Sequence, residues 1–259
     1  MPFKTSLTCK IGGKEDNQDY ADYVILKKKN AACWVVADGL GGHRGGGIAA
    51  KTAVEVILKS FKENPGCSVE AINQYLDAAH GEILRLQQEK PRLSRMRTTV
   101  VMMVSDFKHV LWAHVGDSRL YRLQKGLIDF QTKDQSLPQA MASEGEITAD
   151  QVRFHKERNV LLRTLGQAEL FRPQVHQEKQ PLTEGNAFLL CTDGFWEHVL
   201  EAEMEMDYAK ARTPGKWLRK MEKRLLGKAK AKLDNYTAMA VYFYSKAPTT
   251  DFSREDTRK

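Results

Sequence analysis

The sequence predicts an α+β fold in which antiparallel sheets pack against pairs of helices. Short apolar segments rich in Val, Leu, Trp and Tyr recur along the chain and are bounded by Gly, Asp or Lys, as strands are. Two long amphipathic stretches follow one another directly, so strands and helices do not alternate as they do in parallel doubly wound folds. With 259 residues, the chain is long enough to bury a large core.

The strands are predicted from the length and the β-branched and aromatic content of the apolar segments. They are residues 6–11, 20–26, 32–37, 98–104, 110–115, 119–123, 187–191 and 237–244. Only Gly116-Asp117-Ser118 separates residues 110–115 from residues 119–123. A turn this short predicts that those two strands form an antiparallel hairpin.

Three helices are predicted from apolar residues that recur at helical spacing. They are residues 46–63, 69–88 and 214–226. Pro65-Gly66 lies in the connection between the first two, and Pro214 suits the first turn of the third.

Residues 132–166 are more polar and irregular, with a helix signal after Thr148, and we expect them to form an insertion over one edge of the domain. No repeat, linker or sharp change of composition divides the rest of the chain. We therefore expect one domain over residues 1–245, followed by a polar C-terminal tail at 246–259.

Composition narrows the class of protein. No run of about 18 uncharged apolar residues is present to span a membrane, and residues 1–6 lack the apolar core of a signal peptide, which favours the cytoplasm. The four cysteines, Cys9, Cys33, Cys67 and Cys191, lie far apart without a C-x-x-C pair, which argues against a zinc site and against disulfides.

The net charge of +7 raises the question of nucleic-acid binding. The excess is concentrated in residues 210–232, which lack the interleaved aromatic residues of a base-stacking surface. A solvated helix face explains this stretch better than a nucleic-acid interface does.

Five aspartates stand at or beside strand ends. They are Asp19, Asp38, Asp117, Asp193 and Asp234. Any one of them, Asp38-Gly39 for example, can be explained as simple turn chemistry. Because strand ends are rigid, five together can direct their carboxylates at one point, and Mg²⁺ and Mn²⁺ prefer such oxygen ligands. A glycine after the aspartate also frees its own carbonyl to coordinate, which adds Gly39 to the candidate ligands.

The order of these motifs resembles the metal-dependent serine/threonine protein phosphatases, the PPM (type-2C) family, and especially its compact bacterial members. The blocks that carry the resemblance cover nearly the whole chain: residues 17–19, 36–43, 97–99, 113–119, 132–136, 162–166, 190–196 and 234–237. The resemblance implies a four-layer α-β-β-α sandwich of two antiparallel sheets flanked by helix pairs. It also implies that residues 132–166 are the flap of this family, which influences substrate choice.

The resemblance also implies an activity and a cofactor. A hydroxide that bridges two metal ions, Mn²⁺ or Mg²⁺, would hydrolyse phosphoserine or phosphothreonine in proteins. Asp38 would bridge the two ions. Gly39 and Asp19 would serve one of them, partly through water, and Asp193 and Asp234 the other. Asp117 matches an aspartate associated with a third ion.

Departures from the family pattern concern phosphate binding and proton donation. Lys14 stands where an arginine usually binds the phosphate, and lysine supplies charge but no planar fork. A surface lysine without function is an equal alternative. His43 is the candidate proton donor, through water, although it could instead only orient its loop. Gln135 replaces a frequent histidine, and His114, inside a strand, is predicted to be a core residue.

An active phosphatase is the favoured interpretation, and a pseudophosphatase that binds phosphoproteins as a regulator is the alternative. We expect phosphorylated proteins and a cognate Ser/Thr kinase as partners, no nucleic acid, no membrane, and a monomer. These partners follow from analogy with bacterial relatives.

Overall fold

The computed structural model describes residues 1–40, 45–228 and 233–245, which form two antiparallel sheets. The five-stranded sheet has the order β1 (Phe3–Lys10), β12 (Tyr236–Phe243), β11 (Ala187–Cys191), β7 (Arg119–Gln124) and β8 (Leu127–Gln131). The seven-stranded sheet runs β10 (Gln180–Pro181), β6 (His109–Val115), β5 (Val100–Ser105), β3 (Ala31–Leu40) and β2 (Asp19–Leu26), with β4 (Arg97–Thr98) on β3 and β9 (Gln174–Val175) on β6.

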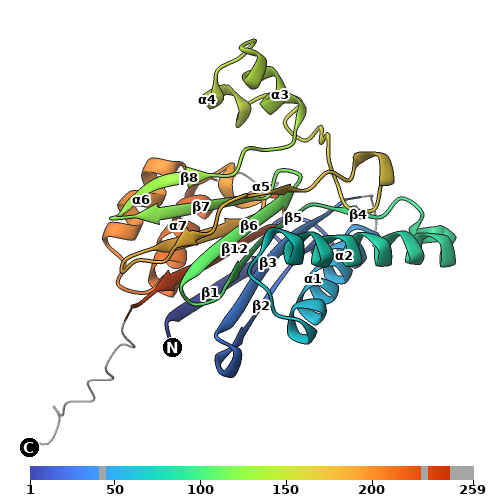
Figure 1. Ribbon diagram of the computed structural model, residues 1–259. Helices are drawn as coiled ribbons and strands as arrows, with labels where there is room; N and C mark the ends of the chain where they lie inside the picture. The colour runs from blue at the N-terminus through green and yellow to red at the C-terminus, as the bar shows by residue number, and fades with distance from the viewer. Residues whose placement is uncertain (41–44, 229–232, 246–259) are drawn as a thin grey trace, which may run out of the picture.

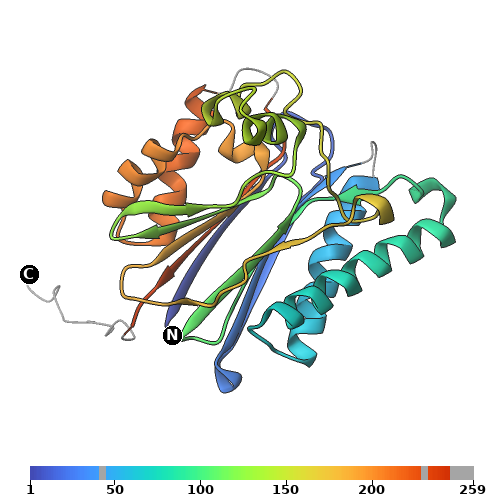
Figure 2. The ribbon, with the colours of Figure 1, turned by 45° about the horizontal axis from the view of Figure 1, so that its top comes forward.

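Helix pairs cover the outer faces of the sheets (Figures 1 and 2). On the seven-stranded sheet lie α1 (Gly45–Glu63) and α2 (Val69–Glu89), and on the five-stranded sheet lie α6 (Glu201–Ala209) and α7 (Pro214–Lys228). The short helices are α3 (Leu137–Glu144), α4 (Ala149–Val152), α5 (Asp193–Trp196) and the 3-10 turns η1 (Lys27–Lys29), η2 (Pro91–Leu93) and η3 (Ala168–Leu170). The predicted four-layer sandwich is thus confirmed.

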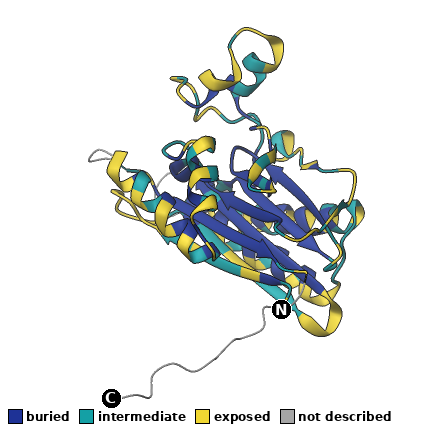
Figure 3. Ribbon diagram, turned by 90° about the vertical axis from the view of Figure 1, so that its left-hand side faces the viewer, coloured by how far each residue is buried: buried dark blue, intermediate teal, exposed yellow. Residues whose placement is uncertain are grey.

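Three apolar clusters fill the spaces between the four layers. Alternation along β3 shows how the sequence specifies them: Cys33 and Val35 pack against the helices, whereas Trp34 and Val36 pack between the sheets. A strand buried on both faces has no polar side, and β3, β5 and β12 are accordingly apolar except for Asp38, Ser105 and Thr237 near their ends (Figure 3). Among the described helices, none is both long and apolar enough to cross a membrane.

The predicted hairpin between residues 110–115 and 119–123 is wrong. β6 pairs with β5, β9 and β10 in one sheet, whereas β7 pairs with β8 and β11 in the other. The three residues between them therefore cross from sheet to sheet. Gly116 makes this possible with a φ of +98°. A side chain there would also meet Thr99, since an added Cβ would lie 2.6 Å from its Cγ2.

The other predicted elements lie close to their observed bounds, except that residues 98–104 are divided. The chain leaves β4 at Thr98 and enters β5 at Val100, so Thr99 lies between two strands. The sequence also gave no strand signal for β8, β9 and β10. Two of these have only 2 residues, too few for any periodicity to register.

The segment 132–166, called the flap below, projects beyond the end of the sandwich with α3 and α4 (Figure 1). Its two stems pair with each other: Leu162 N donates to Gln135 O, and Leu137 N donates to Val160 O. The helix signal after Thr148 is confirmed, because Thr148 and Gln151 form a capping box at α4.

The basic stretch is a solvated helix face over its described part, residues 210–228. Helix α7 buries Trp217, Leu218, Met221 and Leu225 against the five-stranded sheet. Its lysines and arginines lie on the opposite side, partly or fully exposed. The absence of nucleic-acid partners stays a prediction, and the predicted tail 246–259 lies outside the described residues.

Candidate metal centre

Two of the five aspartates face each other across neighbouring strands. Asp19 is the first residue of β2 and Asp38 lies near the end of β3, and the two are cross-strand partners in the ladder. Because facing residues of an antiparallel pair lie about 5 Å apart, the ladder itself fixes the spacing of their backbones.

The other three aspartates reach the same end of the sandwich from other strands. Asp193 follows β11 and Asp234 precedes β12; these strands are antiparallel neighbours, and Thr192 N donates to Thr237 O at their shared end. Asp117 lies in the crossing between β6 and β7. Both sheets therefore contribute carboxylates to one place.

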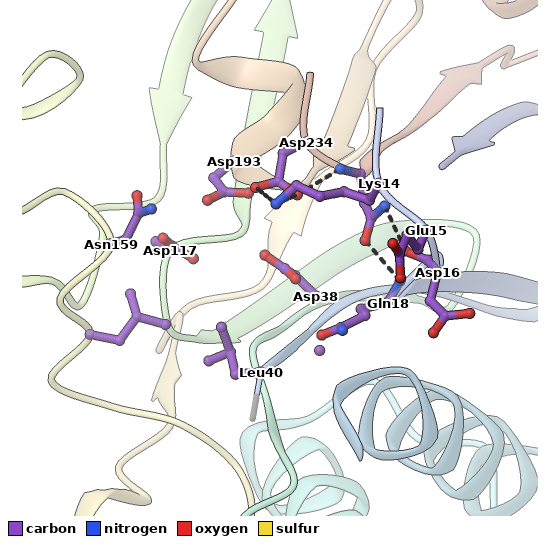
Figure 4. Close-up of a pocket in the computed structure, with 13 residues that line it drawn as sticks. Lys14, Glu15, Asp16, Gln18, Asp38, Leu40, Asp117, Asn159, Asp193 and Asp234 are labelled. Carbon is purple, nitrogen blue, oxygen red and sulfur yellow. Dashed lines mark hydrogen bonds and ion pairs between the residues drawn. The ribbon is translucent and has the colours of Figure 1, made fainter. Parts of the chain in front are cut away.

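These residues surround a cavity of about 430 Å³ (Figure 4). Four of the five aspartates line it directly: Asp38, Asp117, Asp193 and Asp234. Asp19 is 5% exposed, and its Oδ2 accepts a hydrogen bond from Thr192 Oγ1 at 2.8 Å. Asn159 and Leu161 of the flap also line the cavity, and Asn159 lies beside Asp117, on the far side from Lys14 (Figure 4).

The carboxylates raise one another's pKa values. Burial is the largest cause at each site, and the neighbouring negative charges add to it. The pKa of Asp193 rises to about 7 and that of Asp19 to about 6. The pKa values of Asp38 and Asp117 are also raised, and Asp193 is the strongest neighbour of both. Such a cluster favours a bound cation, which would stabilise all the ionised forms together.

The backbone around Asp38 is held by two threonines. Thr98 Oγ1 donates to Asp38 O at 2.8 Å, and Thr99 N donates to the same oxygen at 2.8 Å. Asp38 N donates to Thr99 Oγ1 at 3.2 Å. The next residue, Gly39, is packed so closely that an added Cβ would lie 2.1 Å from Gly46 O, so only glycine fits there.

Asp117 is fixed by its backbone and leaves a carboxylate oxygen available. Trp196 Nε1 donates to Asp117 O at 3.0 Å. Among the described residues, Asp117 Oδ1 is buried without a hydrogen-bond partner. An unpaired buried carboxylate oxygen is costly unless something outside the chain binds it.

The donor set fits a hard divalent cation. It consists of carboxylates and the Gly39 backbone, with acidic neighbours and an orphaned oxygen on Asp117. Within the described residues, no three His, Cys, Asp or Glu side chains converge closely enough to hold an ion unaided. Mg²⁺ and Mn²⁺ typically retain several waters, and an ion here would complete its shell with them.

Lys14 is the one basic side chain among the described residues that line the cavity. Its Nζ lies 2.8 Å from Asp234 Oδ1 and 2.9 Å from Oδ2, and both side chains are about half exposed. The structure therefore places Lys14 beside the carboxylates, and its role in phosphate binding stays a prediction. His43 lies outside the described residues.

His114 is confirmed as a core residue. It is 2% exposed, and its Nε2 lies 2.8 Å from Lys133 O. Gln135, at the root of the flap, accepts a hydrogen bond from Gly116 N at 3.0 Å. It therefore braces the backbone beside Asp117.

Sequence reasoning missed several residues that support the site. They are Thr99, Thr192, Asn235 and, from the flap, Asn159 and Leu161. Thr192 and Asn235 stand directly beside Asp193 and Asp234, and that adjacency was the available signal. No sequence signal pointed to Asn159 and Leu161, because the pattern of neighbouring residues does not predict the path of the flap over the cavity.

Most of the chain matches a known family of proteins. The model described as protein phosphatase 2C matches residues 9–235. The serine/threonine phosphatase stp of Listeria monocytogenes serotype 4b (strain F2365) is 34% identical over 187 residues, covering 70% of this chain and 73% of the relative. Protein phosphatase PhpP of Streptococcus pneumoniae serotype 2 (strain D39 / NCTC 7466) is 26% identical over 204 residues, covering 77% and 81%.

Solved structures share the fold. The S. agalactiae serine/threonine phosphatase superposes with a TM-score of 0.82 at 24% identity, covering 93% of this chain and 100% of that one. The catalytic domain of the serine/threonine phosphatase PstP, in complex with 2 manganese ions, gives a TM-score of 0.78 at 23% identity, covering 93% and 97%.

Proposed function

This chain belongs to the protein phosphatase 2C family and is a protein phosphatase that depends on divalent metal, and we propose that it hydrolyses phosphoserine and phosphothreonine of proteins in the cavity around Asp38. The observation that carries the proposal is the charge of this cavity. Its acidic wall would repel a phosphoryl dianion, unless cations lie between the carboxylates and the substrate.

We assign the ligands as the family resemblance implies, and the gathering of the five aspartates at one end of the sandwich supports the assignment. Asp38 would serve two cations, Asp19 and the Gly39 carbonyl would serve one of them, and Asp193 and Asp234 would serve the other. Asp117, with its unpaired oxygen, would hold a further ion. When bound, the cations would lower the pKa of a coordinated water for attack on phosphorus and offset the charge of the phosphoryl oxygens.

Lys14 and His43 complete the assignment. Lys14 lines the cavity, and its ammonium, which is paired with Asp234, has three donors and would also bind a phosphoryl oxygen. We retain His43 as the proton donor, acting through water, on its sequence position alone. We propose residues 1–245 as the catalytic domain, with the flap as part of the substrate-binding surface.

The test compares the wild-type chain with Asp38→Asn and the matched control Asp22→Asn. Asp22 is an exposed carboxylate in β2, three residues after Asp19. Release of phosphate from a phosphothreonine peptide is measured with Mn²⁺, with Mg²⁺ and with chelator, and Mn²⁺ binding is measured by calorimetry. We expect Asp38→Asn to lose at least ~100-fold in activity together with Mn²⁺ affinity, and Asp22→Asn to match the wild type.

Two outcomes would contradict the proposal. Activity that survives chelator or Asp38→Asn would exclude the metal-based assignment. A wild-type chain that binds the phosphopeptide with Mn²⁺ but releases no phosphate would be a binding protein, which is the alternative drawn from the sequence. A cognate Ser/Thr kinase, the native metal and its number of ions, a monomeric state and a cytoplasmic location stay predictions.

A further inference from the structure

Three side-chain hydrogen bonds of Asn235, including both of its donors, go to one neighbouring segment. Its Oδ1 accepts from Gln18 N at 2.8 Å, and its Nδ2 donates to Ile11 O at 2.7 Å and to Asp16 O at 3.1 Å. All three partners are backbone atoms of residues 11–18, which lie more than 200 positions away in sequence. Asn235 is 7% exposed, so its own side of these bonds is shielded from water.

The segment that Asn235 holds is otherwise tied down by polar contacts: Gly39 N donates to Gln18 O at 3.1 Å, and Asn17 Nδ2 donates to Cys9 Sγ at 3.2 Å. Residues 11–17 are exposed to solvent, and they contribute no member to the three apolar clusters of the described chain. Gly13 N donates to Leu233 O at 2.8 Å, which adds one further bond to the same strand end. A segment without apolar anchors depends on its hydrogen bonds for a defined conformation.

This segment carries Lys14 to the cavity. Lys14 lies between Ile11 and Asp16, whose carbonyl groups Asn235 binds. The Lys14 Nζ contacts the carboxylate of Asp234, the residue before Asn235. A lysine side chain has about 2 kcal/mol of rotamer entropy and an ammonium without fixed direction. Its position is therefore only as well defined as the backbone that bears it.

We propose that Asn235 is a positioning residue for phosphate recognition, acting through Lys14. By fixing the backbone at Ile11, Asp16 and Gln18, the Asn235 amide keeps the Lys14 ammonium facing the carboxylate-lined cavity, where a phosphoryl dianion would bind. The proposal rests on the proposed function, because Lys14 has a phosphate to bind only if the cavity is the phosphatase site.

The competing explanation is that Asn235 only anchors the fold or the adjacent Asp234. Phosphate affinity and metal affinity separate these explanations. If Asn235 acts through Lys14, its loss weakens phosphate binding and leaves Mn²⁺ binding in place. If it acts through Asp234, Mn²⁺ binding falls at least as much.

The experiment is a double-mutant cycle with Asn235→Ala, Lys14→Ala and the double variant, at saturating Mn²⁺. The readouts are the inhibition constant of inorganic phosphate, KM and kcat for a phosphothreonine peptide, Mn²⁺ affinity by calorimetry, and Tm. We expect Asn235→Ala to raise the inhibition constant and KM on the order of tenfold, with a smaller change in kcat. In the Lys14→Ala background, Asn235→Ala should raise the inhibition constant of phosphate and KM by less than about twofold.

Asn186→Ala is the matched control. Asn186 is also a buried asparagine, 3% exposed, whose Oδ1 accepts from Thr183 N at 2.8 Å in a turn outside the cavity. It should lower Tm without changing the inhibition constant of phosphate.

Asn235→Asp covers the case in which Asn235→Ala does not fold. It keeps an acceptor for Gln18 N and loses both donors. Its added charge would repel phosphate equally with or without Lys14, whereas a positioning effect disappears in the Lys14→Ala background.

The inference is overturned if Asn235→Ala and Lys14→Ala raise the inhibition constant of phosphate by factors that multiply in the double variant. It is also overturned if Asn235→Ala lowers Mn²⁺ affinity as much as phosphate affinity, or if it leaves the inhibition constant unchanged in an active enzyme. A wild-type chain without metal-dependent hydrolysis would instead contradict the proposed function. The two failures are therefore distinguishable.

Discussion

Thr99 Oγ1 lies 2.7 Å from Ser118 Oγ, and this pair of hydroxyls joins the strand end that carries Asp38 to the crossing that carries Asp117. Thr99 also accepts the hydrogen bond of Asp38 N. Both residues are buried, so the two hydroxyls form a hydrogen bond with each other where no water reaches them. The separation between two of the cavity's carboxylates is thereby set by a side chain that lies between β4 and β5.

Thr99→Val should weaken metal binding and stability together. Valine keeps the shape of threonine but leaves Asp38 N and Ser118 Oγ without their partner, at a cost of about 1–3 kcal/mol in the free energy of unfolding. Urea unfolding and Mn²⁺ calorimetry measure the two effects. In the control Thr5→Val, Trp34 Nε1 loses its 2.9 Å bond to Thr5 Oγ1, which should lower stability alone. Equal Mn²⁺ affinity in both variants would show that Thr99 has no part in placing Asp38.

The stabilisation of the protein by Mn²⁺ should increase with pH. An unfolded aspartate ionises near 3.8, whereas Asp19 does so near 6 and Asp193 near 7 in the folded, metal-free chain. Between these values the folded state binds more protons than the unfolded state. These two groups therefore lower the free energy of unfolding as pH rises from about 4 to about 7, by up to ~1.4 kcal/mol per group for each pH unit. A cation bound to the ionised carboxylates removes that loss.

The measurement is the difference in Tm with Mn²⁺ and with chelator, taken from about pH 5 to about pH 8. We expect the difference to grow up to about pH 7 and then to level off. Burial also lowers the pKa values of His80 and His114, which makes stability depend on pH, but this contribution is the same with and without metal and cancels in the difference. A difference independent of pH would show that Asp19 and Asp193 do not bind the ion.

Arg119→Met should be strongly destabilising. Arg119 holds Asp134 through two hydrogen bonds of 2.7 Å, with side chains 5% and 2% exposed, and its guanidinium lies 3.4 Å from the centre of the Trp196 ring. Loss of the arginine leaves the flap root with a buried, unpaired carboxylate, which costs about 3–5 kcal/mol in the free energy of unfolding. Chemical denaturation measures this cost, and limited proteolysis reports whether the flap opens first.

The neighbouring pair Arg122–Asp129 provides the comparison. It has similar geometry, with 2.7 Å between Arg122 Nη2 and Asp129 Oδ2, but its side chains are 18% and 30% exposed. Arg122→Met should cost about 1 kcal/mol or less. If Arg119→Met and Arg122→Met lowered the free energy of unfolding by similar amounts, burial of the Arg119–Asp134 pair would not explain the cost of losing Arg119.

Gly39→Ala should abolish the metal centre. The added methyl group would lie 2.1 Å from Gly46 O and 2.8 Å from Gln18 O, so the end of β3 or the start of α1 has to move. Gly81→Ala is the control, since nothing lies within 4 Å of a Cβ at that helical position, and it should stabilise α2 by about 0.5–1 kcal/mol. If Gly39→Ala bound Mn²⁺ as tightly as the wild type does, the close approach of the Gly39 backbone to those of Gly46 and Gln18 would be contradicted.

The sequence was most informative where one local rule applied. Apolar runs that lead into aspartate and glycine predicted that Asp38 and Asp193 lie at strand ends. The turn expected after Asp38 is wrong, because β3 continues to Leu40 and pairs with β4, and Asp193 begins α5. Sequence reasoning failed at the crossing between β6 and β7, since a three-residue connection suits a hairpin and the pairing partners of each strand lie far along the chain. Asn235 was missed for a related reason: its three bonds join positions 217 to 224 residues apart, which no local pattern encodes.

The pairing of β1 with β12 constrains when this enzyme can become active during its synthesis. Asn235 and Asp234 emerge from the ribosome long after Lys14, and until β12 has docked, the segment around Lys14 has nothing to close against. Until then Asp19 and Asp38, which belong to the seven-stranded sheet, lack the carboxylate of Asp234 that comes with the other sheet. Contacts of such long sequence separation form late and slowly, so phosphatase activity should appear abruptly, with the last strand, rather than grow with chain length.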